Sequence, residues 1–162
     1  MFRYKVLTPL VLLIVSACNG SSSQAPGDGD SGQIMDCSSD PSSKAFHVGM
    51  SAIGANGYVV ELVDATPTKP SQDPDGNSWT LRISDANGPA DGVTVTAKCN
   101  MKMPGGGASH GCAVAPPVKA LGGGEYKVSP IYFNMPGHWE LIVSMTDGTR
   151  ADSALFATCI PQ

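Results

Sequence analysis

Five side chains that can coordinate a soft metal occur in two short segments rich in proline and glycine. The first segment contains Met101, Met103 and His110, and the second contains Met135 and His138. Thioether sulfur is a soft ligand that prefers Cu(I), and imidazole binds copper in both of its common oxidation states. The two segments therefore predict a copper site built from methionines and histidines.

Cys99 and Cys112 bracket the first segment, and their redox state decides which ligands it offers. A reduced pair would add a thiolate of the kind that type 1 copper requires, or a redox role, whereas a bridged pair leaves only thioethers and imidazole. A proline and three consecutive glycines predict a loop here, where methionines have little core to fill. The alternative is that Met101 and Met103 simply pack and that His110 is a solvated turn residue.

The residues that could support catalysis do not form a recognisable active site. Residues 107–111, Gly-Ala-Ser-His-Gly, match the G-x-S-x-G nucleophile elbow, but that motif needs a strand before it and a helix after it. Glycines precede it here and no helical pattern follows. The three histidines, His47, His110 and His138, are too few for a copper–zinc dismutase centre, and their spacing does not suggest a catalytic zinc site. We expect no enzymatic activity.

The N-terminus has the three parts of a lipoprotein leader in the right order. Arg3 and Lys5 precede an apolar run over residues 7–17 that is too short to span a bilayer. The run ends in Val15-Ser16-Ala17-Cys18, which resembles the lipobox of bacterial lipoproteins. Residues 1–17 are therefore predicted to be a signal peptide, with cleavage before Cys18 and lipidation of its thiol.

The segment after the lipidation site predicts a tether, and the rest of the chain predicts a domain. Residues 18–43 are rich in Ser, Gly, Asp and Pro, and about 25 such residues span roughly 25–30 Å as a flexible chain. The folded domain is expected over residues 44–162. This organisation predicts a protein of the bacterial cell envelope that is held by lipid on a periplasmic or outer face.

The charge of the mature chain excludes some partners. Without Arg3 and Lys5 it carries 8 Lys and Arg against 14 Asp and Glu, a formal net charge of −6. An acidic chain with few aromatic residues and no basic run argues against nucleic acid as a partner. It also argues against electrostatic docking on anionic lipid, so the lipid on Cys18 is the expected link to the membrane.

Four cysteines remain for disulfides once Cys18 is lipidated, and four cysteines allow three pairings. Export would place them in an oxidising compartment, where disulfides persist. We favour Cys99–Cys112, which closes a short loop, together with Cys37–Cys159, which ties the ends of the domain. The short bridge should contribute roughly 3 kcal/mol to stability, and the long bridge somewhat more.

The domain itself predicts an all-β fold. Short alternating segments recur at regular spacing without a convincing helix. The alternation puts Trp79, Leu81 and Ile83 on one face of their segment, and it puts Trp139 on the inward face of a later segment. The expected strands cover residues 57–64, 78–84, 93–98, 112–118, 125–130, 139–145 and 151–158. About seven short strands of this kind are typical of an immunoglobulin-like β-sandwich.

Several of these segments together resemble a known family. They include Gly57-Tyr58-Val59-Val60-Glu61-Leu62, Trp79-Thr80-Leu81-Arg82-Ile83-Ser84-Asp85 and, as the most specific match, Phe133-Asn134-Met135-Pro136-Gly137-His138-Trp139-Glu140-Leu141. Over about residues 57–160 the chain resembles YtkA-like domains, and FixH-like proteins are similar in the sheet and in the Met-Pro-Gly-x-Trp turn. The resemblance implies an exported immunoglobulin-like sandwich, often lipid-anchored, with links to copper handling in some members.

The loops of the resembling domains and of this chain differ in two respects. Members often carry a Met-Pro-x-Met-x-His-like loop, into which Met101, Met103 and His110 fall here, although glycines stretch the spacing and the bracketing cysteines depart from the pattern. The expected function is that of an envelope lipoprotein that binds copper through this loop and donates it to an envelope protein. The alternative is a metal-free β-sandwich that presents its loops to a protein partner. A weaker reading is an accessory domain without a site of its own.

Overall fold

The computed structural model describes residue 37 and residues 40–73, 75–102 and 109–162. The chain divides into two units, Met1–Gly32 and Gln33–Gln162, and all described residues belong to the second. The predicted signal peptide, the predicted lipidation site at Cys18 and most of the predicted tether lie outside the described residues. Among the described residues, no helix is long and apolar enough to cross a membrane.

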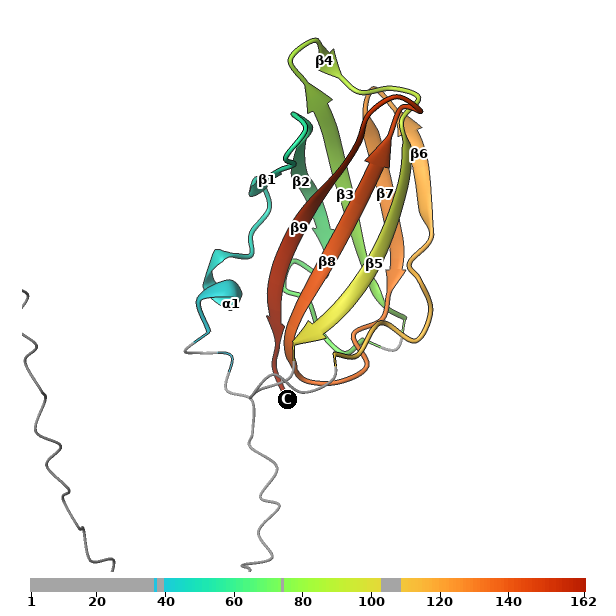
Figure 1. Ribbon diagram of the computed structural model, residues 1–162. Helices are drawn as coiled ribbons and strands as arrows, with labels where there is room; N and C mark the ends of the chain where they lie inside the picture. Colours follow the sequence, from blue (N-terminus) through green and yellow to red (C-terminus); the bar gives the residue numbers. More distant parts are fainter. Residues whose placement is uncertain (1–36, 38–39, 74, 103–108) are drawn as a thin grey trace, which may run out of the picture. The chain divides into compact units, whose positions relative to one another are not determined.

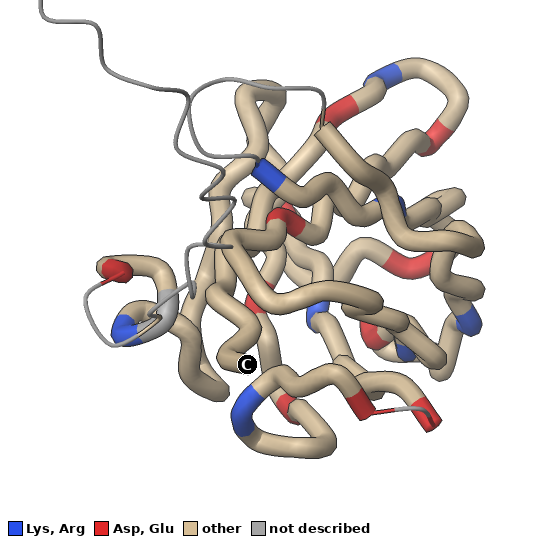
Figure 2. The backbone as a smooth tube through the Cα atoms, turned by 90° about the horizontal axis from the view of Figure 1, so that it is seen from below, with Lys and Arg blue, Asp and Glu red and all other residues tan. Residues whose placement is uncertain are grey.

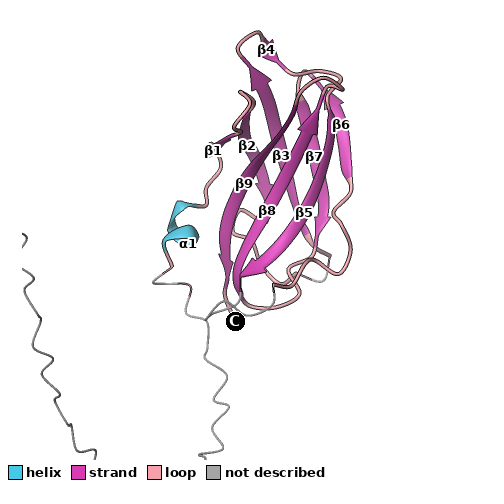
Figure 3. Ribbon diagram, in the orientation of Figure 1, coloured by secondary structure: helices cyan, strands magenta, loops and turns pink. Residues whose placement is uncertain are grey.

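Strands dominate the described part of the chain (Figure 3). They are accompanied by one short helix, and the elements in chain order are α1 (Pro41–Ala45), β1 (Ser51–Ile53), β2 (Val59–Thr66), β3 (Asn77–Asp85), β4 (Gly88–Pro89), β5 (Thr94–Lys102), β6 (Val118–Gly122), β7 (Glu125–Ile131), β8 (Gly137–Thr146) and β9 (Ala151–Ile160).

Two antiparallel sheets form the sandwich (Figure 1). The larger sheet has the order β1-β2-β3-β7-β6 with β4 paired to the end of β3, and the smaller has the order β5-β8-β9. The orders β2-β3-β7-β6 and β5-β8-β9 correspond to the A-B-E-D and C-F-G sheets of an immunoglobulin constant-type domain. The predicted immunoglobulin-like β-sandwich is therefore confirmed, with β1 and β4 as two short additions to its seven strands.

The core lies between the sheets and is filled by the inward residues of alternating strands. Trp79 on β3 and Trp139 on β8 are both fully buried, and Phe133 lies between them with ring centroids 6.1 and 5.4 Å away. Phe46, just after α1, packs on Trp79 at 4.8 Å. The predicted inward faces of β3 and β8 are thus correct, because alternate side chains of a half-buried strand point to one side.

Two local predictions were wrong. Residues 112–118 do not form an edge strand; the edge strand is β6, which begins at Val118, because the prolines at 116 and 117 cannot donate to a ladder. A helix exists at Pro41–Ala45, where Asp40 caps its first turn by accepting from the Ser42 backbone N–H at 2.7 Å. Residues 86–87 form a turn, and the two residues after it form β4, which pairs back onto β3.

Candidate functional site

The candidate metal ligands lie at the end of the sandwich where β5 and β9 finish and β8 begins, which is also the end that carries the C-terminus (Figure 1). In the register of β5 and β8, Met101 faces Trp139 and Lys102 faces His138. Adjacent residues of a strand point to opposite faces, so Met101 points toward the core and His138 points outward. The structure therefore brings all the described candidates to one end but separates them between two faces.

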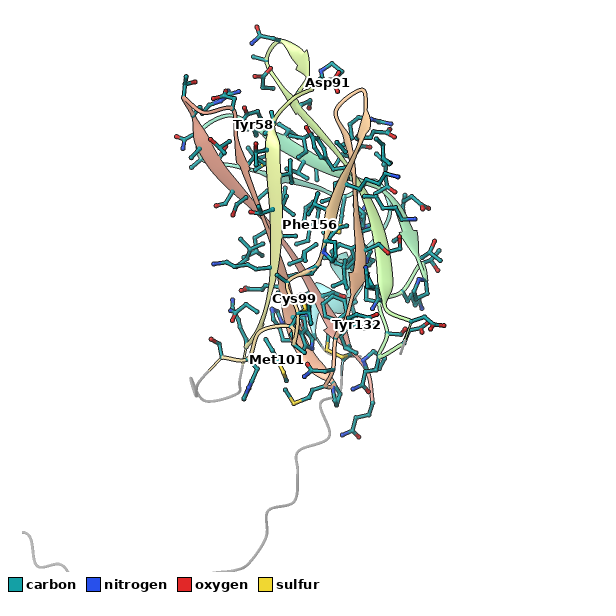
Figure 4. All side chains as sticks on the ribbon, turned by 90° about the vertical axis from the view of Figure 1, so that its right-hand side faces the viewer. Tyr58, Asp91, Cys99, Met101, Tyr132 and Phe156 are labelled. Carbon is teal, nitrogen blue, oxygen red and sulfur yellow. A yellow bond between two sulfur atoms is a disulfide. The ribbon has the colours of Figure 1, made fainter. Side chains whose placement is uncertain are left out.

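Met101 belongs to a strand and not to the loop that the sequence predicts. Strand β5 continues to Lys102, and the Met101 side chain is 5% exposed within the core cluster. Its position near the end of β5 is labelled in Figure 4, close to Cys99. Because Met101 is buried, its thioether fills core space. Because Met101 is also one residue from the end of β5, the thioether lies close to this end of the sandwich. Met103, the next methionine, lies outside the described residues.

His110 is the partner of Met101 across a short antiparallel bridge. The Met101 backbone N–H donates to the His110 carbonyl oxygen at 2.6 Å, on the side of β5 away from β8. Directly opposed residues of an antiparallel pair present their side chains to the same face, with Cβ atoms about 4.5–5.5 Å apart. His110 is exposed, so the pair joins a buried thioether to a solvent-accessible imidazole.

The Cys99–Cys112 disulfide closes the base of the same loop. The two Cα atoms are 5.2 Å apart, and residue 99 faces residue 112 in the same register that sets residue 101 against residue 110. Cys99 is buried, and Cys112 is half-buried against the core. The bridge therefore holds His110 beside Met101, and in this state neither cysteine offers a thiolate.

Met135 lies in the loop before β8, where its carbonyl oxygen accepts a hydrogen bond from the Trp139 indole N–H at 2.9 Å. Its side chain is half-buried and packs against the core cluster. Trp139 in turn lies opposite Met101. Met135 and Met101 therefore both contact Trp139, Met135 through its carbonyl oxygen and Met101 through strand pairing, and part of Met135 is open to solvent.

His138 is engaged by residues that the sequence did not predict. Its Nδ1–H donates to Oδ2 of Asp40 at 3.1 Å, and Ser42 Oγ lies 3.3 Å from the same nitrogen. The pair is half-buried; burial by itself would raise the pKa of Asp40, but hydrogen bonds from Ser42 and His138 lower it overall. Asp-Pro-Ser at residues 40–42 is a helix-start pattern that could have signalled an ordered segment.

A second disulfide lies beside His138. Cys37 and Cys159 have their Cα atoms 5.5 Å apart, and Cys159 faces His138 in the register of β8 and β9. Both pairings favoured from the sequence are thus present. Together with the contact between Asp40 and His138, this bridge fastens the N-terminal part of the described chain to the outer side of the smaller sheet.

The charges around this end do not form a surface of one sign. Seen from this end in Figure 2, lysines, arginines and acidic residues are interspersed. Lys102 forms an ion pair with the buried Glu140, its outward neighbour on β8.

Within the described residues, no group of three or more His, Cys, Asp and Glu side chains is placed to hold a metal ion. The arrangement that remains is the thioether–imidazole pair of Met101 and His110.

The fold and this end of the sandwich define an immunoglobulin-like β-sandwich domain with a disulfide-closed loop. A family model described as YtkA-like matches residues 54–144, more than half of the chain, so the chain belongs to the YtkA-like family. The match includes Met101, His110, Met135 and His138, whereas Cys37, Asp40 and Cys159 lie outside it. Neither the curated proteins nor the solved structures compared with the chain gave a match.

Proposed function

We propose that this YtkA-like protein is a lipid-anchored protein of the bacterial cell envelope. It binds Cu(I) at the end of the sandwich where Met101 pairs with His110, which we call the Met101–His110 rim, and it passes the ion to another envelope protein. The observation that supports the proposal most directly is the bridge between these two residues, held in place by the neighbouring disulfide. A thioether and an imidazole on one face are ligands that suit Cu(I).

The donor set fits reversible transfer better than permanent storage. Thioethers carry no charge and need no deprotonation, so binding and release cost no proton exchange, unlike a thiolate site. His110 is exposed and would meet the ion first, whereas Met101 reaches the rim from the core side. Met135 is half-buried and is a candidate third ligand. Met103, two residues after Met101 in the sequence, is a further candidate. His138 is held by Asp40 on the other face, so we leave it out of this ligand set.

A Cu(I) titration of the mature protein against a competing Cu(I) chelator tests the proposal. His110→Ala and Met101→Leu should each weaken binding, and the leucine keeps the core volume, since such swaps usually cost less than about 1.5 kcal/mol. Matched controls are His47→Ala, an exposed histidine after α1, and Met145→Leu, a buried methionine near the other end of β8. A parent protein that leaves all the copper with the chelator would overturn the copper function.

The membrane anchor is tested separately through Cys18. Replacing it by serine removes the thiol that lipid would modify, so the protein should move from the membrane fraction to the soluble envelope fraction. Incorporation of a labelled fatty acid should disappear in the same variant. A Cys18→Ser protein that stays in the membrane fraction with its label would overturn the anchor.

A metal-free interaction module is the second candidate, and two observations favour it. Met101 is 5% exposed, and His138 already has a carboxylate partner, so two of the predicted ligands have structural roles. In that case the same titration would show no copper binding, and the loop end would bind a protein partner in the presence of a strong copper chelator. The two candidates therefore give opposite results in one experiment.

A further inference from the structure

Four soft donors form a two-by-two array at the end of β5. Cys99 faces Cys112, and two residues further along Met101 faces His110, in one antiparallel register. Rows two residues apart are separated by roughly 6.5–7 Å at the usual rise of a strand, and opposed Cβ atoms by about 5 Å. All four side chains therefore project to the same face, although the Cys and His side chains among them are not placed to hold a metal ion while the disulfide is intact.

The array is half open to solvent. Cys99 and Met101 are 7% and 5% exposed and belong to the core side, whereas Cys112 is half-buried and His110 is exposed. An ion can therefore approach from the side of His110 and Cys112, while the two other donors close the site from within. As long as the disulfide is intact, its sulfurs provide no thiolate, and only Met101 and His110 are available.

We propose that the Cys99–Cys112 disulfide is a redox lock, and that its reduction creates a four-ligand metal site of Cys99, Cys112, Met101 and His110. This inference rests on the proposed function for the identity of the natural cargo, Cu(I). Two thiolates, one thioether and one imidazole are a soft, four-donor set of the kind that holds Cu(I) or a tetrahedral d¹⁰ ion. Reduction thus converts a weak transfer site into a tight one.

The reducing step balances with a dithiol protein or small dithiol of the envelope as reductant. A thiolate of the dithiol attacks the sulfur of Cys112, the more exposed of the pair, and the electron pair of the broken S–S bond leaves on Cys99. The second thiol of the reductant then attacks the mixed disulfide and releases Cys112. The reductant ends as a disulfide, the protein gains two thiols, and metal binding releases their two protons to solvent.

The fold can open this bridge without losing the domain. The Met101–His110 backbone hydrogen bond of 2.6 Å remains, and so does the Cys37–Cys159 bridge, which spans 122 residues. That second bridge is less accessible to a reductant, because both of its cysteines are at most 8% exposed. Selective reduction of Cys99–Cys112 is therefore expected under mild conditions.

The test compares oxidised and mildly reduced mature protein, with two free thiols mapped to Cys99 and Cys112 by alkylation and mass spectrometry. Cu(I) affinity against a chelator should rise by at least about 100-fold on reduction, or about 2.8 kcal/mol at 1.4 kcal/mol per factor of ten. Cd²⁺, a redox-inert probe, should show thiolate charge-transfer absorption in the reduced protein alone. Two controls should lose both responses: Cys99→Ser/Cys112→Ser, and the reduced wild type alkylated with iodoacetamide, which covers a variant that fails to fold.

The outcomes separate this inference from the proposed function. Equal Cu(I) affinity before and after reduction, or an equal gain in the serine variant, would overturn the redox lock while leaving a thioether–imidazole site intact. Binding by the reduced protein alone would support the four-ligand site and overturn copper binding by the oxidised form. Absence of both Cu(I) and Cd²⁺ binding in the reduced protein would overturn the four-ligand site.

Discussion

The carboxylate of Asp40 accepts a hydrogen bond from Nδ1 of His138 at 3.1 Å, across 98 residues of the chain. The contact joins the start of α1 to the start of β8, beside the bridge that ties Cys37 to Cys159 on β9. Cys159, His138 and Lys102 lie in one cross-strand row. Cys37 therefore lies at the same end of the domain as Met101 and His110.

Removal of the Asp40 carboxylate should loosen this attachment. Asp40→Ala loses both the cap of α1 and the contact with His138, so we expect a cost of about 1–2 kcal/mol at neutral pH. Asp40→Asn keeps a capping oxygen and should cost less. Urea unfolding measures both, with Asp64→Ala on an exposed position of β2 as a control that should stay within about 0.5 kcal/mol.

The contribution of Asp40 should also depend on pH in a defined direction. Burial raises its pKa, but the hydrogen bonds from Ser42 and His138 bring the net value below the ordinary 3.8. The unfolded chain therefore takes up the proton first as the pH falls, so the stabilisation is complete above about pH 3.8 and is lost below it. If Asp40→Asn shows the same acid dependence as the parent, the carboxylate does not make this contribution.

Most of the fold could be predicted because apolar and polar residues alternate along its longer strands. Trp79, Leu81 and Ile83 alternate with polar residues on β3, and a period of two can bury only one face. Short elements such as α1 and β4 were not predicted, because they contain too few residues for any period to emerge. Their positions depend on partners elsewhere in the chain, such as the end of β3 for Pro89.

The candidate site could be predicted only in part, for a different reason. Met101 was placed in a loop because glycines and a proline follow it, but pairing with Trp139 on β8 extends β5 beyond the disulfide. The pairing of Met101 with His110 follows from the bridge between cysteines and was within reach of sequence reasoning. The engagement of His138 by Asp40 was not, since nothing local in either segment indicates the other.

The two disulfides should contribute unequally to stability. The Cys37–Cys159 bridge closes a loop with a sequence separation of 122, and Cys99–Cys112 closes one of 13. In the loop-entropy estimate, loss of the long bridge costs about 5 kcal/mol and loss of the short one about 3 kcal/mol. Paired serine variants of each bridge, compared by urea unfolding, measure the difference. A larger loss for the short bridge would show that local packing around Cys99, and not chain entropy, sets its contribution.

The hairpin between β6 and β7 contains a glycine that the packing requires. Gly123 and Gly124 both have positive φ, +64° and +75°, but a Cβ on Gly124 would lie 2.6 Å from the Ile83 carbonyl oxygen, whereas one on Gly123 meets nothing within 4 Å. Gly123→Ala should cost about 1–2 kcal/mol from the backbone conformation alone. Gly124→Ala should cost a further 1–3 kcal/mol or so, because the added methyl displaces β3 or β7. Thermal unfolding of the pair measures the difference; equal losses would mean that the hairpin shifts freely.

Arg150 organises the opposite end of the sandwich. Its guanidinium lies 3.8 Å from the centroid of the Tyr58 ring and donates to Oδ2 of Asp85 at 2.7 Å. Its backbone N–H donates to Oδ1 of Asp147 at 2.7 Å, and Tyr58 donates its hydroxyl to the other oxygen of Asp147 at 3.0 Å. Arg150 therefore reaches Asp85 through its side chain and Asp147 through its backbone N–H, and its Nε also lies 3.5 Å from Oδ2 of Asp147.

Replacing Arg150 by glutamine should separate these two carboxylates in a titration. The pKa of Asp85 is below its ordinary value chiefly because the Arg150 guanidinium donates to it, so it should rise toward 3.8 in the variant. The pKa of Asp147 is lowered chiefly by the backbone N–H of Arg150, which the substitution retains, so it should rise less than that of Asp85 even though the Nε contact at 3.5 Å is lost. Carboxyl ¹³C shifts followed by NMR from neutral pH into the acid range measure both groups in one sample.

Both carboxylates stabilise the fold above about pH 3.8 and lose that contribution as the pH falls through their folded pKa values. The variant should therefore lose mainly the part due to Asp85, and an equal rise in the pKa of Asp147 would contradict the backbone assignment.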